Sequence, residues 1–176
     1  MYRLCTTEKT ATQQKQFTDT LLLLLQKQPY QEISISELCR NAGLSRNIFY
    51  RLFDSKTDVL HALIDNYCVL CSQLDNSDTP REKITSFYTF WKKNKLLLDI
   101  LDRDDLFTHL VTRGYQCFAH LDIALAKDEY LLCFYASAFT GLLLKWYRSN
   151  FSRSEEEMTA ITYELVAKPI IKLVTP

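Results

Sequence analysis

The stretch "AGLSRNIFYRLF", Ala42 to Phe53, carries two different groups of side chains directly after a glycine. It opens with Ser45, Arg46 and Asn47, and Arg51 lies four residues after Asn47, on the same face of a helix. The apolar side chains that would pack beneath this face are Leu38, Ala42, Ile48, Phe49, Leu52 and Phe53. The stretch therefore predicts a short amphipathic helix whose leading end presents hydrogen-bond donors.

A second short helix is predicted immediately before it, in "ISISELCRNAG". Ser34 is a typical N-cap, Glu37 three residues later completes a capping box, and Gly43 ends the helix. Two short helices around a tight glycine turn fit a helix-turn-helix, whose second helix enters the DNA major groove. An ordinary helical hairpin with a solvated polar face has the same spacing, so the spacing alone leaves both interpretations open.

The donors on the second helix match the chemistry of DNA. Arginine suits bidentate contact with guanine and asparagine with adenine, which favours Arg46, Asn47 and Arg51 as base contacts. Ser45, Tyr50 and the backbone amides at the start of the helix suit phosphate.

Apolar residues recur at helical spacing through most of the 176 residues, and glycine (3) and proline (4) are scarce. We therefore expect an all-α fold of about nine helices. Besides the two helices above, they are expected at about 10–27, 55–74, 80–94, 95–101, 105–126, 128–148 and 155–168.

Composition limits the class of protein. No stretch resembles a signal peptide, and the longest apolar run, Leu21 to Leu25, is far shorter than a membrane span, so we expect a cytoplasmic chain without membrane contact. The six scattered cysteines, including Cys68 and Cys71, favour reduced core residues over a disulfide framework or a metal site. No catalytic motif, phosphate loop or metal-ligand spacing is present, which predicts neither an enzyme nor a cofactor.

The net charge of zero, taken alone, argues against a nucleic-acid binder. Residues 1–60 carry a slight basic excess and the remainder a slight acidic excess. The sign of this asymmetry allows DNA contact near the N-terminus.

The run "ISISELCRNAGLSRNIFYRLFDSKTDVLHALI" resembles the DNA-binding domain of the TetR-like family of bacterial transcriptional regulators, over about residues 10–65. The matching features are the Ser34 cap, the turn at 42–45, Tyr50, Phe53 and Lys56. The resemblance implies phosphate contacts from Ser34, Ser45, Tyr50 and Lys56, and base contacts from Arg46, Asn47 and Arg51. Two departures from the family pattern, Leu52 and Asn47, leave the target sequence open.

The segment "FTGLLLKWYRSNFSRSEEEM", Phe139 to Met158, is similar to a subgroup related to dihydroxyacetone-kinase regulators. The resemblance implies that the last two helices form a four-helix interface with a second copy. The expected interface residues are Gly141, Leu142, Trp146, Met158 and Ile161. The alternative is that these residues belong to the core of a single chain.

The middle of the chain is rich in aromatic residues, which predicts an apolar cavity for a small apolar or aromatic effector. The candidate ligand-binding residues are Phe87, Trp91, Phe107, His109, Tyr115, Phe118 and Phe134. A filled core is the alternative interpretation.

Together these observations predict a helix-turn-helix domain at 1–56 and a regulatory and dimerisation domain at 57–176. The expected function is a ligand-responsive repressor that binds a near-palindromic double-stranded operator as a homodimer. A helical protein-interaction module that does not bind DNA is the alternative.

Overall fold

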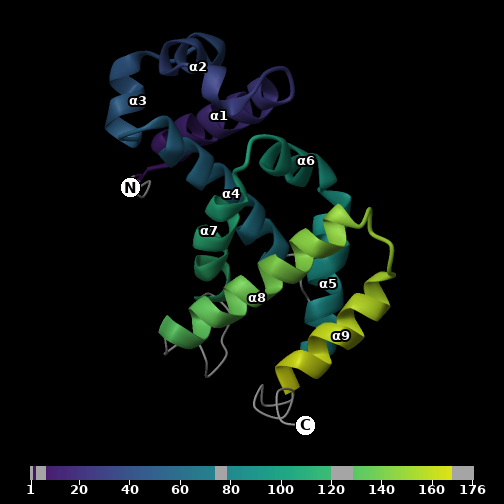
Figure 1. Ribbon diagram of the computed structural model, residues 1–176. Helices are drawn as coiled ribbons and strands as arrows, with labels where there is room; N and C mark the ends of the chain where they lie inside the picture. Colours follow the sequence, from purple (N-terminus) through teal and green to yellow (C-terminus); the bar gives the residue numbers. More distant parts are fainter. Residues whose placement is uncertain (1, 3–6, 74–78, 120–128, 168–176) are drawn as a thin grey trace. The chain divides into compact units, whose positions relative to one another are not determined.

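The computed structural model describes residues 2, 7–73, 79–119 and 129–167, with the backbone alone for 115–119 and Ala167. These residues form nine α-helices and no β-strand (Figure 1). The helices are α1 (Glu8–Leu25), α2 (Ile35–Ala42), α3 (Arg46–Leu52), α4 (Lys56–Gln73), α5 (Pro80–Lys93), α6 (Lys95–Arg103), α7 (Phe107–Ala119), α8 (Glu129–Arg148) and α9 (Glu155–Ala167). The all-α expectation is confirmed, and a single 3-10 turn, Tyr30–Glu32, adds an element that the sequence pattern did not predict.

The chain divides into two compact units. The first comprises residues 1–67 and 100–113, and the second comprises residues 68–99 and 114–176. The start of α4 and the start of α7 thus belong to the same unit as the helix-turn-helix. The functional division expected at residue 56 stays a prediction.

The core of the first unit joins α1 to α3 through aromatic rings. Phe17 meets Phe49 and Phe53 edge to face, with ring centroids 5.5 and 5.8 Å apart, and all three side chains are almost fully buried. Edge-to-face contacts of this kind add to the free energy of burial. The apolar side of α3 is therefore held against α1, and its polar side is left outward.

The turn between α2 and α3 has the geometry that its residues predict. The Ser34 hydroxyl accepts the Glu37 amide at 3.1 Å, and the Ser45 hydroxyl accepts the Ile48 amide at 3.3 Å. Gly43 takes the left-handed conformation, with φ of 66°, and ends α2. The expected capping box also requires the Glu37 carboxylate to accept the Ser34 amide. This part of the prediction is wrong, because the carboxylate accepts a hydrogen bond from the side chain of Gln28 instead.

The second unit is organised around α5 and α9, which lie side by side (Figure 1). Thr79 and Glu82 form the full capping box that the sequence predicts at the start of α5. The Tyr88 hydroxyl, on α5, lies 2.6 Å from the hydroxyl of Thr162 on α9, and both side chains are buried. Burial raises the pKa of Tyr88 to about 12, so this phenol stays protonated and able to donate.

Two sequence expectations about local structure need correction. A helix start at residue 105 is wrong, because Asp105 has a φ of 56° and the Leu106 amide bonds back to the Leu101 carbonyl at the end of α6. Helix α7 consequently starts at Phe107. The expectation of reduced cysteines is wrong at Cys68, which is disulfide-bonded.

Candidate nucleic-acid interface

Helix α3 presents a polar surface opposite its buried aromatic side. Arg46 and Asn47 in its first turn are exposed, and 45% of the Tyr50 surface is accessible to solvent. Arg46 donates from its guanidinium to the Tyr50 hydroxyl at 3.3 Å, and its guanidinium carbon lies 5.9 Å from the centroid of the Tyr50 ring. The side chains that the sequence predicts as base contacts at the start of the helix are thus on the outer face.

Arg51, near the end of α3, is also exposed but is held from another helix. Its Nη2 donates to Oε1 of Gln13, on α1, at 2.8 Å. Only one of the five N–H groups of a guanidinium is used in this bond. The remaining N–H groups are available for acceptors on a nucleic acid.

Ser34 and Ser45 start the two helices of the motif. Each hydroxyl oxygen already accepts a backbone amide, so each hydroxyl hydrogen can donate outward. A phosphate oxygen at the start of α2 or α3 would accept from it and would also be favoured by the helix dipole. The geometry therefore suits the phosphate contacts that the resemblance implies.

Lys56, at the start of α4, has an additional role that the sequence did not indicate. Its ammonium donates to the carbonyls of Tyr30 and Ile33 at 2.5 and 2.6 Å and lies 4.1 Å from the centroid of the Tyr30 ring. Partial burial lowers the pKa of this ammonium. Lys56 thus holds the segment that precedes α2, and a phosphate would have to use its remaining N–H.

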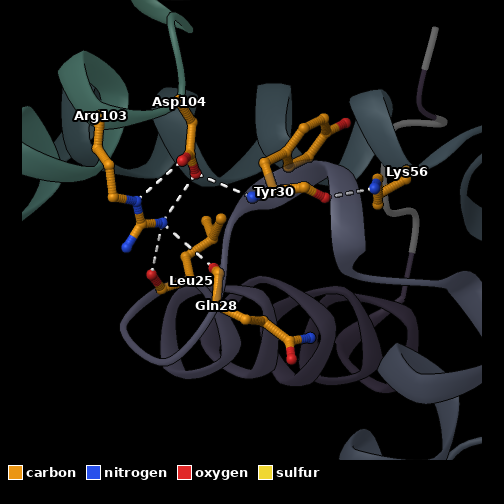
Figure 2. A network of polar contacts seen from close by, with 6 residues as sticks. All are labelled: Leu25, Gln28, Tyr30, Lys56, Arg103 and Asp104. Carbon is orange, nitrogen blue, oxygen red and sulfur yellow. Dashed lines mark hydrogen bonds and ion pairs between the residues drawn. The ribbon is translucent and has the colours of Figure 1, made fainter.

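The same segment is held from the opposite side by the end of α6 (Figure 2). Arg103 donates to the carbonyls of Leu25 and Gln28 at 2.9 and 3.2 Å, and to both carboxylate oxygens of Asp104. Asp104, whose side chain is 5% exposed, accepts the Tyr30 amide at 2.9 Å. The hydrogen bonds from Arg103 and the Tyr30 amide hold the pKa of Asp104 below its usual value.

A polar cluster joins α4 to α7 within the first unit. His61 Nε2 lies 2.9 Å from His109 Nδ1, and burial lowers the pKa of both imidazoles. Arg113 donates from Nε to Asp65 at 2.7 Å, and the hydroxyl of Tyr2 bonds to the same carboxylate. Among the residues whose side chains are described, no group of three or more His, Cys, Asp or Glu has an arrangement that could hold a metal.

The expected ligand-binding residues do not gather within one unit. Phe107 and His109 lie in the first unit, whereas Phe87, Trp91 and Phe134 lie in the second. Phe87 contacts Trp91 and Phe139, with ring centroids 6.4 and 5.4 Å apart. The side chains of Tyr115 and Phe118 lie outside the described residues.

The expected dimer residues on α8 and α9 differ in their exposure. Trp146 is 2% exposed, donates from Nε1 to the Arg153 carbonyl at 3.0 Å and meets the Tyr88 ring edge to face, and Met158 is also buried. Both side chains are thus buried within their own chain, and their part in a dimer interface stays a prediction. Gly141 is exposed, whereas Leu142 and Ile161 are half-buried.

An apolar cavity of about 130 Å³ opens between α8 and α9 in the second unit. It is lined by Phe134, Tyr135, Ala138, Phe139, Leu142, Thr162, Leu165 and Val166. Phe134, which was expected to bind a ligand in the interior, is 45% exposed here, and Leu165 and Val166 are each 40% exposed. We call these three exposed residues together with Leu142 the α8–α9 face.

Sequence reasoning missed three residues that position the motif: Gln13, Arg103 and Asp104. Each acts through a contact between segments that are far apart in the chain. Gln13 gave one weak signal, because it falls one turn before Phe17 on the inner face of a predicted helix, where a polar side chain needs a partner.

Helix α8, with 20 residues, is the longest in the described part of the chain, and α1 and α4 have 18 residues each. No helix in the described part of the chain is long and apolar enough to cross a membrane.

The fold of this chain is similar to that of a solved structure. A solved structure described as a TetR transcriptional regulator from Streptococcus agalactiae 2603V aligns over 90% of this chain and 94% of its own length, with 17% identity and a TM-score of 0.60. The fatty acid degradation regulator FadR from Bacillus halodurans aligns over 86% of this chain and 93% of its own, with 14% identity and a TM-score of 0.45. No curated protein matches the chain.

Two family models match separate parts of the sequence. Residues 18–63 match the model of bacterial regulatory proteins of the tetR family, and this range contains α2, α3 and the start of α4. Residues 103–168 match the model of a transcriptional regulator C-terminal region. The chain is thus a TetR-family transcriptional regulator with an N-terminal helix-turn-helix DNA-binding domain.

Proposed function

We propose that this regulator is a ligand-responsive repressor that binds a near-palindromic operator as a homodimer. The observation that carries the proposal is the two-sided α3. Phe49 and Leu52 are buried on one side, while Arg46, Asn47 and Tyr50 are exposed on the other. A helix of this kind suits insertion into the major groove, with its donors toward the base edges.

In this proposal Arg46, Asn47 and Arg51 contact bases, and Ser34, Ser45, Tyr50 and Lys56 contact phosphates. Base contacts determine sequence preference, whereas phosphate contacts determine register and the dependence on salt. The protein has no catalytic role in this proposal, and it acts in the cytoplasm, where it can reach the bacterial chromosome.

The α8–α9 face supports the homodimer. Exposed apolar residues gathered around a cavity are typical of interaction surfaces, and a symmetric dimer would cover the same face on both copies. Gly141 has no atom within 4 Å of where a Cβ would stand, so the chain itself leaves room there for close approach. The likeness of 139–158 to regulators related to dihydroxyacetone kinase belongs to the same proposal.

The effector part of the proposal rests on the aromatic residues Phe87, Trp91 and Phe139 of the second unit. A small apolar or aromatic compound would suit such a lining. To act as an inducer, it must bind the DNA-free form better than the DNA-bound form, because only differential affinity shifts the equilibrium.

The DNA-binding part is tested by capture and sequencing of genomic fragments, followed by gel shifts on the recovered sites over a salt series. We expect discrete complexes that weaken steeply with salt. Arg46→Ala should cost about 1–3 kcal/mol of binding free energy, whereas Lys93→Ala, which removes an exposed charge from α5, should leave affinity unchanged. Absence of discrete complexes at low salt would favour the protein-interaction module.

The dimer part is tested by light scattering at micromolar concentration. Phe134→Glu should give a monomer, because it places a charge within the apolar α8–α9 face. Leu23→Glu is the matched control, since Leu23 is also an exposed apolar residue, at 58% against 45% for Phe134, but lies on α1. A monomeric wild-type protein would overturn the homodimer.

A further inference from the structure

We infer that Gln13, on α1, is a positioning residue that orients the Arg51 guanidinium of α3 and thereby sharpens base preference at the end of the recognition helix. This inference rests on the proposed DNA contact of Arg51. Helix α1 would then take part in sequence selection, although it lies outside the helix-turn-helix pair α2 and α3.

The geometry makes Gln13 a well-fixed acceptor. It is 8% exposed, and its Oε1 lies 2.8 Å from Nη2 of Arg51. One turn later on α1, Phe17 is fully buried against Phe49 and Phe53. The acceptor therefore stands on a helix that is firmly packed against α3, and Arg51 is held from outside its own helix.

The neutral charge of the amide matters. A glutamine oxygen accepts one hydrogen bond from the guanidinium but leaves its positive charge in place for DNA. A carboxylate at the same position would also orient the arginine, but it would neutralise the charge and repel nearby phosphates. Position 13 therefore carries a group that orients Arg51 without competing for it.

Preorganisation gives the contact its effect on binding. A free arginine samples many rotamers, and ordering it on DNA lowers affinity, whereas a side chain already held loses less entropy. Arg46 is ordered within α3 by Tyr50, four residues on. Arg51 is ordered by α1, so the two arginines of the outer face depend on different partners.

The test uses the full-length protein and the DNA site that wild-type protein selects from a random-sequence library. Gln13→Ala should lower affinity about two- to ten-fold and broaden the base preference at one position in each half-site, without changing the salt slope. Gln13→Glu should lower affinity further and reduce the salt slope by about one. Gln16→Ala, which changes an exposed glutamine of the same helix, should match wild type.

A double-mutant cycle separates positioning from a loss of stability. If Gln13 acts through Arg51, Gln13→Ala should have no further effect on affinity or base preference in an Arg51→Ala background. An equal effect in both backgrounds, or a Gln13→Ala protein with wild-type base preference, would overturn the inference. If wild-type protein selects no site, the proposed function fails instead, so the two failures are distinguishable.

Discussion

The contact between Asp104 and the Tyr30 amide gives a quantitative prediction. Tyr30 is 6% exposed, and its amide donates to a carboxylate 74 residues away. Asp104→Ala removes that acceptor and leaves the buried Tyr30 N–H without a hydrogen-bond partner, which lowers the unfolding free energy by about 1–3 kcal/mol. The lost pair with Arg103 adds at most about 1 kcal/mol, because Arg103 is 42% exposed and keeps its two carbonyl partners.

Thermal unfolding and amide hydrogen exchange measure this effect. A loss of about 2 kcal/mol corresponds to a fall of about 4–8 °C in Tm for a chain of this size, and the Tyr30 amide should lose protection. Asp104→Asn keeps an oxygen acceptor and should cost less. Asp19→Ala breaks an exposed ion pair with Lys15 and should stay within about 0.5 kcal/mol of wild type.

An Asp104→Ala protein with wild-type Tm and unchanged protection of the Tyr30 amide would show that this hydrogen bond does not stabilise the fold. Equal losses from Asp104→Ala and Asp104→Asn would show that the ion pair, and not the hydrogen bond to the amide, dominates the cost.

Local contacts determine how stability responds to pH and to substitution at three other sites. Burial lowers the pKa of His61 and of His109 in the folded protein. The unfolding free energy should therefore have its full value above pH about 6.5 and should fall as the pH drops from there to the lowered pKa values. His109→Gln should make this fall smaller in urea titrations at pH about 7.5 and about 5.5. Tyr88→Phe should cost about 1–2 kcal/mol in urea unfolding, and adding Thr162→Val should recover part of it, since both partners are then apolar. Gly43→Ala should cost about 1–2 kcal/mol from backbone strain alone, because a Cβ there meets no atom within 4 Å; no change in Tm would contradict the left-handed turn.

The helices were predictable because their signals are local. Ser45, Thr79 and Gly43 act within four residues of themselves, and the caps and the turn form where the sequence places them. The contacts that position the motif were not predictable in this way. The bond from Gln13 to Arg51 and the bond from Tyr30 to Asp104 depend on how separate helices pack, and no periodicity encodes such partners.

Interface residues were harder to predict for a related reason. Apolar residues on a helix have the same spacing in the sequence whether they pack inside their own chain or against a second copy. Trp146 and Leu142 lie one turn apart on α8, yet the first is buried against Tyr88 and the second lines the α8–α9 cavity. Only the packed arrangement of α5, α8 and α9 distinguishes these two environments.

The zero net charge of the chain is compatible with DNA binding because the Lys and Arg side chains have different kinds of partner in different parts of the chain. Outside the recognition helix, several Lys and Arg side chains pair with carboxylates: Lys15 with Asp19, Lys92 with Glu155, Lys95 with Asp99, Arg103 with Asp104 and Arg113 with Asp65. On α3, the groups that hold Arg46 and Arg51 in the described contacts are a phenol and an amide, both neutral. A carboxylate partner cancels a charge, whereas a neutral partner only orients it. Arg46 and Arg51 therefore keep their positive charges on α3, although the net charge of the whole chain is zero.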